Sequence, residues 1–275
     1  MKKAINAWTI PQCVPFEDMF RQVSEAGFHA IELNIDAQDA SCHSLTMDSG
    51  RELYDQINGL VQRYNLPVCS ISTSLYGGTL GSDDPTEQEY GKGVLRKQLE
   101  CARALGADAI LVVPGGISES VSIQKATQNS RHAISQMIGE IEGAKIAAGL
   151  ENVWNGFFAS PTDMAAFIDS FGSSYIRAYF DVGNVAAFSY PEYWIEILGP
   201  RICKVHVKDY LRTGGWHSGC WANLLQGSIR WDRVTASLRQ AGYAGHLTAE
   251  LPVLEQAPEY LYEMTSKALD HILYL

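Results

Sequence analysis

Residues 147–152 read Ala-Ala-Gly-Leu-Glu-Asn, a short apolar segment whose carboxyl end carries Glu151. Three later segments repeat this arrangement and carry Asp181, His206 and Glu250 at their carboxyl ends. If the four segments are neighbouring parallel strands, three carboxylates and one imidazole converge on one point. The fold therefore depends on whether these segments belong to one parallel sheet.

Across the whole chain, short β-rich segments alternate with longer amphipathic segments in eight rounds. The predicted strands are Lys3 to Trp8, His29 to Asn34, Pro67 to Ser72, Ala109 to Pro114, Ala147 to Asn152, Ile176 to Asp181, Ile202 to Lys208 and His246 to Leu251. A strand followed by a helix, repeated eight times, predicts a single (β/α)8 TIM barrel. No long linker or low-complexity tract divides the chain, so we expect residues 1–275 to form one domain.

The composition is that of an ordinary globular protein, with 46% hydrophobic and 19% charged residues. The formal net charge of −10 argues against nucleic-acid binding, because that affinity depends on Lys and Arg side chains that neutralise phosphates. No stretch approaches the roughly 20 apolar residues of a membrane span, and polar residues interrupt any signal-peptide core behind Met1-Lys2-Lys3. Six dispersed cysteines without a CxxC pair are typical of free thiols. We therefore expect a cytoplasmic protein with no membrane partner.

The four strand-end residues predict a divalent-metal site. Three carboxylates and one imidazole are mainly oxygen donors, which suit Mn²⁺ or Mg²⁺ and can accept Co²⁺ or Zn²⁺; we expect Mn²⁺. Such a metal can polarise a sugar carbonyl and stabilise the enediolate that forms when the neighbouring C–H loses its proton. Glu151 and Glu250, nearly opposite across the barrel mouth, can then work as base and acid. One carboxylate at a strand end is most often a brace, but four such placements on one face favour a site.

Two predicted connections are longer than a turn requires, Thr73 to Gly93 and Asp209 to Ile229. Long connections in a compact domain are usually functional lids or disordered. The second connection contains Arg212, Trp216, His217 and Trp221, a mixture of aromatic and hydrogen-bonding groups suited to covering a small polar ligand. We expect it to form a lid.

Several motifs resemble those of the sugar phosphate isomerase/epimerase family of xylose-isomerase-like barrels. In the second half of the chain these motifs are Leu-Glu-Asn-Val (150–153), Phe-Asp-Val-Gly-Asn (180–184), Val-His-Val-Lys-Asp (205–209), Gln-Gly-Ser-Ile-Arg-Trp (226–231) and Gly-Tyr-Ala-Gly-His-Leu-Thr-Ala-Glu (242–250). The first half agrees more loosely, through residues 26–33 and 105–115. The resemblance therefore spans nearly the whole chain.

The resemblance implies 3-epimerisation of a ketose or ketose phosphate. It implies that Glu151, Asp181, His206 and Glu250 are the metal ligands. The two glutamates would exchange the substrate proton on opposite faces of a metal-bound enediolate.

The resemblance also implies substrate contacts. Arg212, six positions after His206, matches an arginine that contacts substrate in ketose 3-epimerases of the family. Members that act on free sugars tend to carry histidine where this chain has Asn184, and Asp-Val-Gly-Asn is closer to members that act on phosphorylated ketoses. The family's usual Gly-Glu-Gly is replaced by Leu225-Gln226-Gly227, so the lid is expected to differ in shape.

Three further residues are candidate substrate contacts. Lys208 shares the inward strand face with His206 and can reach a substrate oxygen or phosphate, or form an ion pair with Glu151 or Asp181. Glu32 is expected at the end of the second predicted strand, where it contacts substrate or braces the barrel. Trp8 lines the mouth from the first predicted strand or packs against its neighbours.

Other functions on the same barrel make different demands. An apurinic-site endonuclease uses a cluster of metals with several more histidines, whereas this chain has seven histidines and only His206 stands convincingly at a strand end. Inosose dehydratase and hydroxypyruvate isomerase share the enolisation step and stay open as alternatives. A non-catalytic sugar-binding barrel is a third alternative, although binding a neutral sugar needs no pair of carboxylates aimed at a metal. The expected partners are a small sugar or sugar phosphate and further copies of the chain, in a homodimer or homotetramer.

Overall fold

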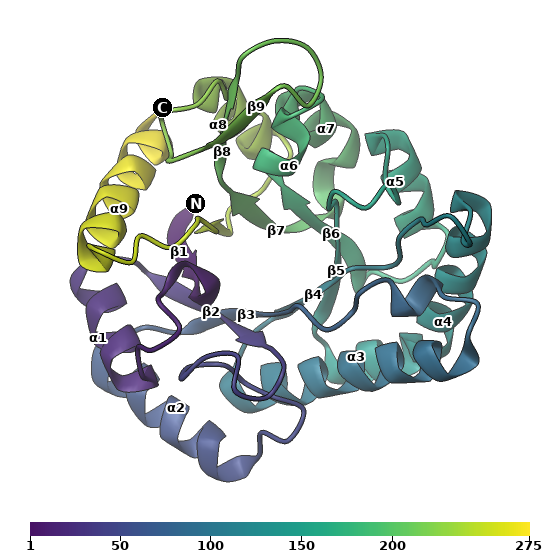
Figure 1. The fold of residues 1–275 in the computed structure, drawn as a ribbon, viewed down its shortest axis with the longest axis horizontal. Helices are drawn as coiled ribbons and strands as arrows, with labels where there is room; N and C mark the ends of the chain where they lie inside the picture. Colours follow the sequence, from purple (N-terminus) through teal and green to yellow (C-terminus); the bar gives the residue numbers. More distant parts are fainter.

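The apolar segments predicted from the sequence form one closed ring of parallel strands in the computed structural model, which describes residues 1–275 (Figure 1). In ring order the strands are β1 (Lys2–Asn6), β10 (His246–Ala249), β7 (Ile202–Val207), β6 (Ile176–Asp181), β5 (Ala147–Glu151), β4 (Ala109–Val112), β3 (Val68–Thr73) and β2 (Ala30–Ile35). Pairing of β1 with β10 closes the ring and places Ile5 opposite Ala249. The predicted (β/α)8 barrel is confirmed.

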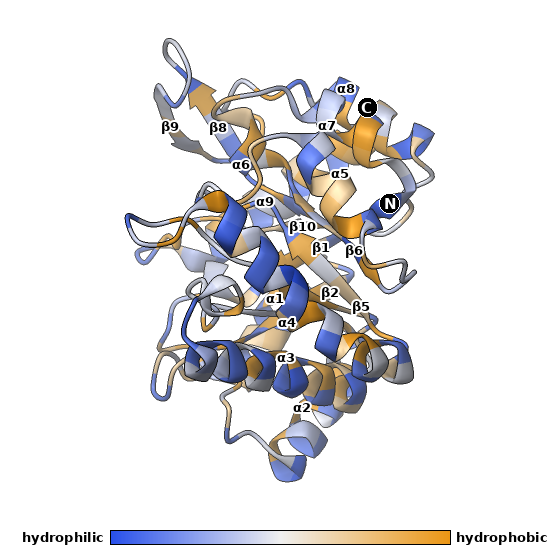
Figure 2. Ribbon diagram, turned by 90° about the vertical axis from the view of Figure 1, so that its right-hand side faces the viewer, coloured by the Kyte–Doolittle hydropathy of each residue, from blue (hydrophilic) through white to orange (hydrophobic).

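Helices surround the ring of strands (Figure 1). They are α1 (Phe16–Glu25), α2 (Arg51–Tyr64), α3 (Pro85–Leu105), α4 (Ile123–Ala144), α5 (Pro161–Asp169), α6 (Val182–Ala186), α7 (Pro191–Leu198), α8 (Trp231–Gln240) and α9 (Pro258–Tyr274), with short 3₁₀ turns η1 (Ala7–Thr9), η2 (Thr79–Gly81) and η3 (Gly199–Arg201). Their apolar faces and the strands form the main hydrophobic core, while hydrophilic residues mark the outer helix surfaces (Figure 2). None of the helices combines the length and apolar character that crossing a membrane requires.

Local chemistry explains where several helices begin. The Ser122 hydroxyl accepts the backbone N–H of Lys125 at 3.3 Å and caps α4, and the Ser160 hydroxyl caps α5 in the same way. These contacts satisfy N–H groups that have no partner within the helix. At the other end of a helix, Gly106 adopts a φ of +74° directly after α3, a conformation that glycine takes without strain.

The two long connections differ from each other in the structure. After β3, helix α3 already begins at Pro85, so the irregular segment is shorter than the predicted Thr73 to Gly93. The reason is local, because the Asp84 carboxylate accepts the backbone N–H of Thr86 at 2.7 Å and proline fits a first helical turn.

The second long connection contains an antiparallel hairpin of β8 (Asp209–Arg212) and β9 (Gly219–Ala222). Its register places Tyr210 opposite Trp221. The hairpin stands out from the rest of the molecule (Figure 2). The predicted lid segment therefore contains a small two-stranded sheet at the barrel mouth.

Candidate metal centre

The four strand-end side chains come together at the mouth of the barrel. Glu151 and Asp181 are the last residues of β5 and β6, His206 is next to last in β7, and Glu250 directly follows β10. One ligand atom from each lies within 4.8 Å of the others. His206 Nδ1 lies 3.1 Å from Glu151 Oε1 and 3.3 Å from Glu250 Oε2. The parallel register brings them together, since β6 and β7 pair with Asp181 opposite His206.

The donors of this cluster fit a divalent cation. Asp181 Oδ1 accepts the backbone N–H of Asn184 at 2.7 Å, but the buried Oδ2 accepts no hydrogen bond. Lys208 Nζ lies 3.0 Å from this oxygen, in ion-pair range but without hydrogen-bond geometry. A buried carboxylate oxygen without a donor costs free energy, and a cation among the four side chains would satisfy it. Three carboxylates and one imidazole are also a donor set that Mn²⁺, Mg²⁺, Co²⁺ and Zn²⁺ accept.

The two glutamates of the cluster differ in proton affinity. Burial raises the pKa of Glu151 to about 7, although the hydrogen bond with His206 opposes this shift. Burial also disfavours the charged form of Glu250, but the Lys208 ammonium and His206 hold the pKa of Glu250 well below its usual range. Glu250 is also the most exposed of the four ligand candidates, with 23% of its side chain accessible.

Lys208 extends from the end of β7 into the same cluster. Its ammonium lies 3.0 Å from Asp181 Oδ2, as one of the two predicted ion pairs requires, and it donates to Glu250 Oε2 at 2.9 Å instead of contacting Glu151. Although burial opposes it, these two carboxylates raise the pKa of Lys208. The lysine stem packs so closely on Gly183 that a side chain at position 183 would overlap it.

Asn184 belongs to a hydrogen-bonded brace beside the cluster. Its side-chain amide donates to the carbonyl of Asn152 at 3.0 Å. Asn152 in turn exchanges two hydrogen bonds with the Asp181 backbone, at 2.8 and 2.9 Å. The sequence reading did not select Asn152, although it directly follows Glu151 in the Leu-Glu-Asn-Val motif. The brace holds the loops after β5 and β6 at a defined distance from each other.

Glu32 and Trp8 occupy positions that differ from those expected. Glu32 lies in the middle of β2, and its fully buried side chain contacts His206 Nε2 at 2.6 Å. Strand β1 ends at Asn6, so Trp8 lies in the turn η1 instead of the predicted strand. The reason is that the Asn6 side chain accepts the backbone N–H of Trp8 at 2.7 Å and turns the chain. The half-buried Trp8 indole donates to Asp36 at 3.1 Å.

Arg212 fastens the hairpin to the body of the barrel. Its guanidinium donates to the carbonyl of Ala186 at 2.6 Å and to the carbonyl of Ser189. It also lies 4.7 Å from the ring centre of Tyr190, in the range of a cation–π contact. The substrate contact that the family resemblance implies for Arg212 stays a prediction.

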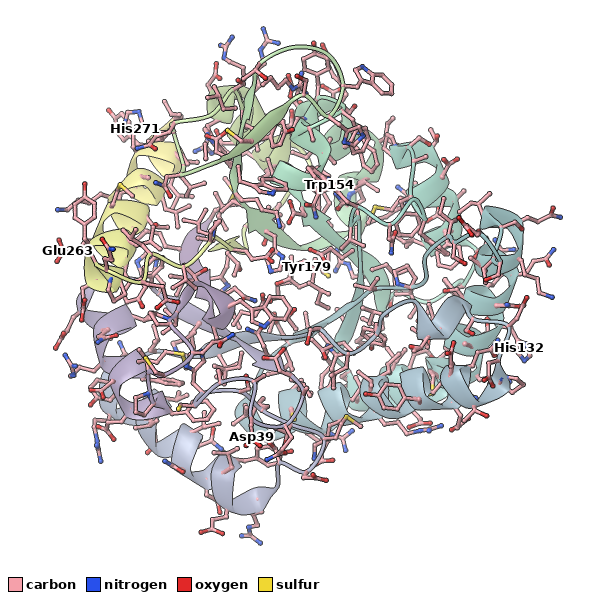
Figure 3. The ribbon with its side chains drawn as sticks, viewed as in Figure 1. Asp39, His132, Trp154, Tyr179, Glu263 and His271 are labelled. Atoms are coloured by element: carbon pink, nitrogen blue, oxygen red, sulfur yellow. The ribbon has the colours of Figure 1, made fainter.

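An aromatic wall joins the hairpin to the loop after β5. The rings of Trp154 and Trp221 stack with their centroids 4.8 Å apart, and the Trp154 indole donates to the carbonyl of Asn184 at 2.8 Å. Lys208 Nζ lies 5.3 Å from the ring centre of Trp221. Figure 3 shows Trp154 beside α6, and Tyr179 inside the ring of strands. Trp154 was not among the residues predicted to lie at the site. Its position three residues after Glu151 was the feature of the sequence that could have indicated it.

Asp209 closes the base of the hairpin. Its fully buried carboxylate accepts the backbone N–H groups of Tyr210 and Leu225 and the indole N–H of Trp231, at 2.9, 3.0 and 3.0 Å. A side chain at Gly227 would overlap this carboxylate, so only glycine fits there. Both ends of the hairpin segment are thus tied to one buried group.

Known proteins share this fold. A profile of the family described as xylose isomerase-like TIM barrel matches residues 20–269. The 3-oxo-isoapionate decarboxylase of Pectobacterium atrosepticum is 29% identical over 153 residues, which cover 53% of this chain and 52% of that protein. The chain thus aligns with about half the length of this relative.

Solved structures agree with the family match. The D-tagatose 3-epimerase-like protein superposes with a TM-score of 0.79 at 19% identity, over 99% of this chain and 98% of the other. The IOLI protein with a binding zinc atom superposes with a TM-score of 0.80 at 14% identity, over the same shares of both chains. At these identities the structures show a shared fold, and the profile match extends over most of the chain. The chain belongs to the xylose isomerase-like TIM barrel family.

Proposed function

We propose that the chain is a divalent-metal-dependent isomerase of small sugars, specifically a 3-epimerase of a ketose or ketose phosphate. The observation that carries the proposal is the convergence of Glu151, Asp181, His206 and Glu250, with ligand atoms within 4.8 Å of one another. The fold relatives support it, because one is described as D-tagatose 3-epimerase-like and another holds a zinc atom.

The four side chains would hold the cation, for which we propose Mn²⁺ because oxygen donors predominate. When bound, a divalent cation supplies Lewis acidity that makes the hydrogen beside a sugar carbonyl more acidic. Asp181 and His206 are fully buried and make the rigid inner part of the site. Glu250 is partly exposed, so a small substrate can reach its carboxylate from the mouth.

Glu151 and Glu250 provide the proton chemistry in this proposal. One carboxylate removes the proton from the carbon beside the carbonyl, and the other returns a proton to the opposite face, which inverts that carbon. The ammonium of Lys208, 2.9 Å from Glu250, holds this carboxylate in place and favours its ionised form. Lys208 and Asn184 are also the proposed contacts for substrate oxygens, with Arg212 and Trp8 farther out.

An enolising lyase is the second candidate function. The specific observation in its favour is the 29% identity with 3-oxo-isoapionate decarboxylase over 153 residues. A decarboxylase and an epimerase share an electron-rich enolate stage and differ in whether carbon dioxide or a proton leaves the substrate. The same residues therefore serve either reaction, and the products distinguish the two.

The proposal is tested by proton exchange. Manganese-loaded protein is incubated in deuterated water with a panel of ketoses, ketose phosphates and sugar-derived 3-oxo acids, the products are analysed by NMR, and released carbon dioxide is measured. We expect deuterium at the carbon beside the carbonyl together with the 3-epimer. Carbon dioxide release from a 3-oxo acid, without exchange into any ketose, would replace the epimerase proposal by the lyase. Neither exchange nor release would refute both.

The proposal also concerns the cellular compartment and the oligomeric state of the protein. All six cysteines are free, which supports a reducing compartment such as the cytoplasm. The homodimer or homotetramer expected from the sequence stays a prediction, which light scattering on the purified protein would check.

A further inference from the structure

A buried carboxylate lies directly beneath the candidate metal centre. Glu32 is fully buried in the middle of β2, and its Oε1 lies 2.6 Å from Nε2 of His206. The other ring nitrogen of His206, Nδ1, faces Glu151, Asp181 and Glu250. The imidazole therefore spans the distance between one carboxylate below and three carboxylates above.

The hydrogen bond between Glu32 and Nε2 of His206 determines whether Nδ1 can bind a cation. A neutral imidazole carries one N–H donor and one acceptor, and the hydrogen bond made by one nitrogen sets the state of the other. An ionised carboxylate accepts hydrogen bonds and donates none. When His206 is neutral, as a metal ligand is, the contact with Glu32 therefore places its hydrogen on Nε2. The lone pair of Nδ1 then points toward the three carboxylates, as a metal ligand must.

Glu32 is itself held in place from three other strands. The Asn6 amide on β1 donates to Oε1 at 2.5 Å, and the hydroxyls of Ser70 on β3 and Tyr179 on β6 both donate to Oε2. All three side chains are fully buried. The Tyr179 ring also contacts the His206 ring, with centroids 4.6 Å apart. A carboxylate with this many donors cannot rotate away from His206 without losing several buried hydrogen bonds.

We propose that Glu32 is a positioning residue that fixes the tautomer and ring orientation of His206 and thereby sets the affinity of the site for its divalent cation. The inference rests on the proposed metal site and adds a residue outside the ligand set. Partners of this kind typically change metal affinity by about 10- to 100-fold when they are replaced.

Glutamine at position 32 separates this role from simple space filling. The amide has nearly the volume of the carboxylate but can turn its NH₂ group toward Nε2. The ring would then carry its hydrogen on Nδ1, where it would block the cation. A residue that only filled space would tolerate the replacement without a change in metal binding.

The test uses Zn²⁺ as the probe because it is diamagnetic. Zinc affinity is measured by competition with a chromophoric chelator, and ¹⁵N NMR reports the His206 tautomer in the zinc-loaded protein. We expect Nε2–H in the wild type and a roughly 10- to 100-fold weaker affinity in Glu32→Gln. The matched control is Glu192→Gln, which changes a buried glutamate on α7 that contacts Arg233 at 3.6 Å, and it should leave the affinity unchanged.

The outcomes separate this inference from the proposed function. Wild-type zinc binding combined with less than about a twofold loss in Glu32→Gln would overturn the role of Glu32 and leave the metal site standing. Nδ1–H in the zinc-loaded wild type would do the same. A wild type that binds no zinc, manganese or cobalt would overturn both. If Glu32→Gln does not fold, the Ser70→Ala, Tyr179→Phe double variant loosens the carboxylate instead, and unchanged zinc affinity in it would also refute the role.

Discussion

The histidines at the two ends of the barrel have pKa values that shift in opposite directions. His206, near the mouth, is fully buried, and Glu32 and the cluster carboxylates raise its pKa well above the usual value although burial opposes this. His246, the first residue of β10, lies at the opposite end of the barrel. Burial lowers the pKa of His246 to about 4, with Lys204 and Lys2 contributing in the same direction.

Two buried lysines at the end of the barrel opposite the mouth, here called the lower end, each form an ion pair with one aspartate. Lys204 lies 2.6 Å from Asp108, and Lys3 lies 2.8 Å from Asp270. A cavity of about 560 Å³ opens there, and its polar groups include the Lys204–Asp108 pair. At the mouth, by contrast, three carboxylates gather around one lysine and one histidine. The difference is that the mouth holds more carboxylates than cations and a carboxylate oxygen that accepts no hydrogen bond, which is why we place the proposed metal site there.

The largest expected effect comes from the two glutamates of the mouth. Glu151→Gln and Glu250→Gln should each lower kcat by about 10⁴-fold or more, because in the proposed function each glutamate is both an acid–base group and a ligand. Asp108→Asn at the lower end should leave kcat unchanged. Steady-state rates on the substrate found by deuterium exchange check this, with circular dichroism to confirm folding. Near-normal turnover in both glutamine variants would contradict the comparison.

Removing the metal should affect only the properties that depend on the four-residue cluster at the barrel mouth. We expect a chelator to abolish activity and Mn²⁺ to restore it. Manganese at about 100 times its Kd should also add about 2.7 kcal/mol to the free energy of unfolding. Differential scanning fluorimetry with and without metal measures this gain. The His206→Ala variant should lose it, and full metal-dependent stabilisation of that variant would remove His206 from the site.

The pH dependence of the free energy of unfolding should reflect the protonation of His246 at the lower end of the barrel. The pKa of His246 is lower in the folded protein than in the unfolded chain, so the unfolded chain binds a proton first as the pH falls. Stability should therefore be lost as the pH drops from about 6.5 toward 4, by on the order of 1–2 kcal/mol. Urea unfolding at several pH values would show a shallower loss in His246→Gln. An identical loss in the wild type and the variant would assign this pH dependence to other groups.

The smallest change in stability should come from replacing Asp108, the exposed partner in the ion pair with Lys204. Asp108 is 80% exposed, whereas the Lys204 side chain is only 5% exposed. We expect Asp108→Asn to lower the free energy of unfolding by about 1 kcal/mol or less, since solvent screens the interaction. Urea denaturation measures this change. A loss of several kcal/mol would show that Lys204 depends on Asp108 far more than the exposure of this carboxylate implies.

The sequence predicted the strands and their ends better than the contacts between strands. Strand periodicity and the carboxyl-end rule were enough to place Glu151 and Asp181 beside His206, because adjacent parallel strands end at the same face. The depth of Glu32 could not be predicted, since it depends on the register of β2 against β3, which shifts between Ile31 and Glu32. Periodicity within one strand carries no information about such a shift.

The hairpin and the stacking of Trp154 on Trp221 could not be predicted from the sequence for a related reason. Trp154 and Trp221 are far apart in the chain, and their stacking follows from where two loops meet. The end of β1 at Asn6 was missed because a side-chain hydrogen bond to Trp8 competes with the strand pattern. Single-residue capping of this kind needs structural context to be recognised.

The buried carboxylate of Asp209 fixes the position of the hairpin relative to the barrel. Because this one group binds the backbone at Tyr210 and Leu225 and the indole of Trp231, both ends of the insert are anchored at a single point. Changes between these anchors that spare Arg212 and Trp221 should therefore leave the strand that carries His206 in place. Replacing residues 213–218, while Asp209, Arg212, Trp221 and Gly227 are kept, would show whether the tip of the hairpin affects the substrate preference of the proposed enzyme.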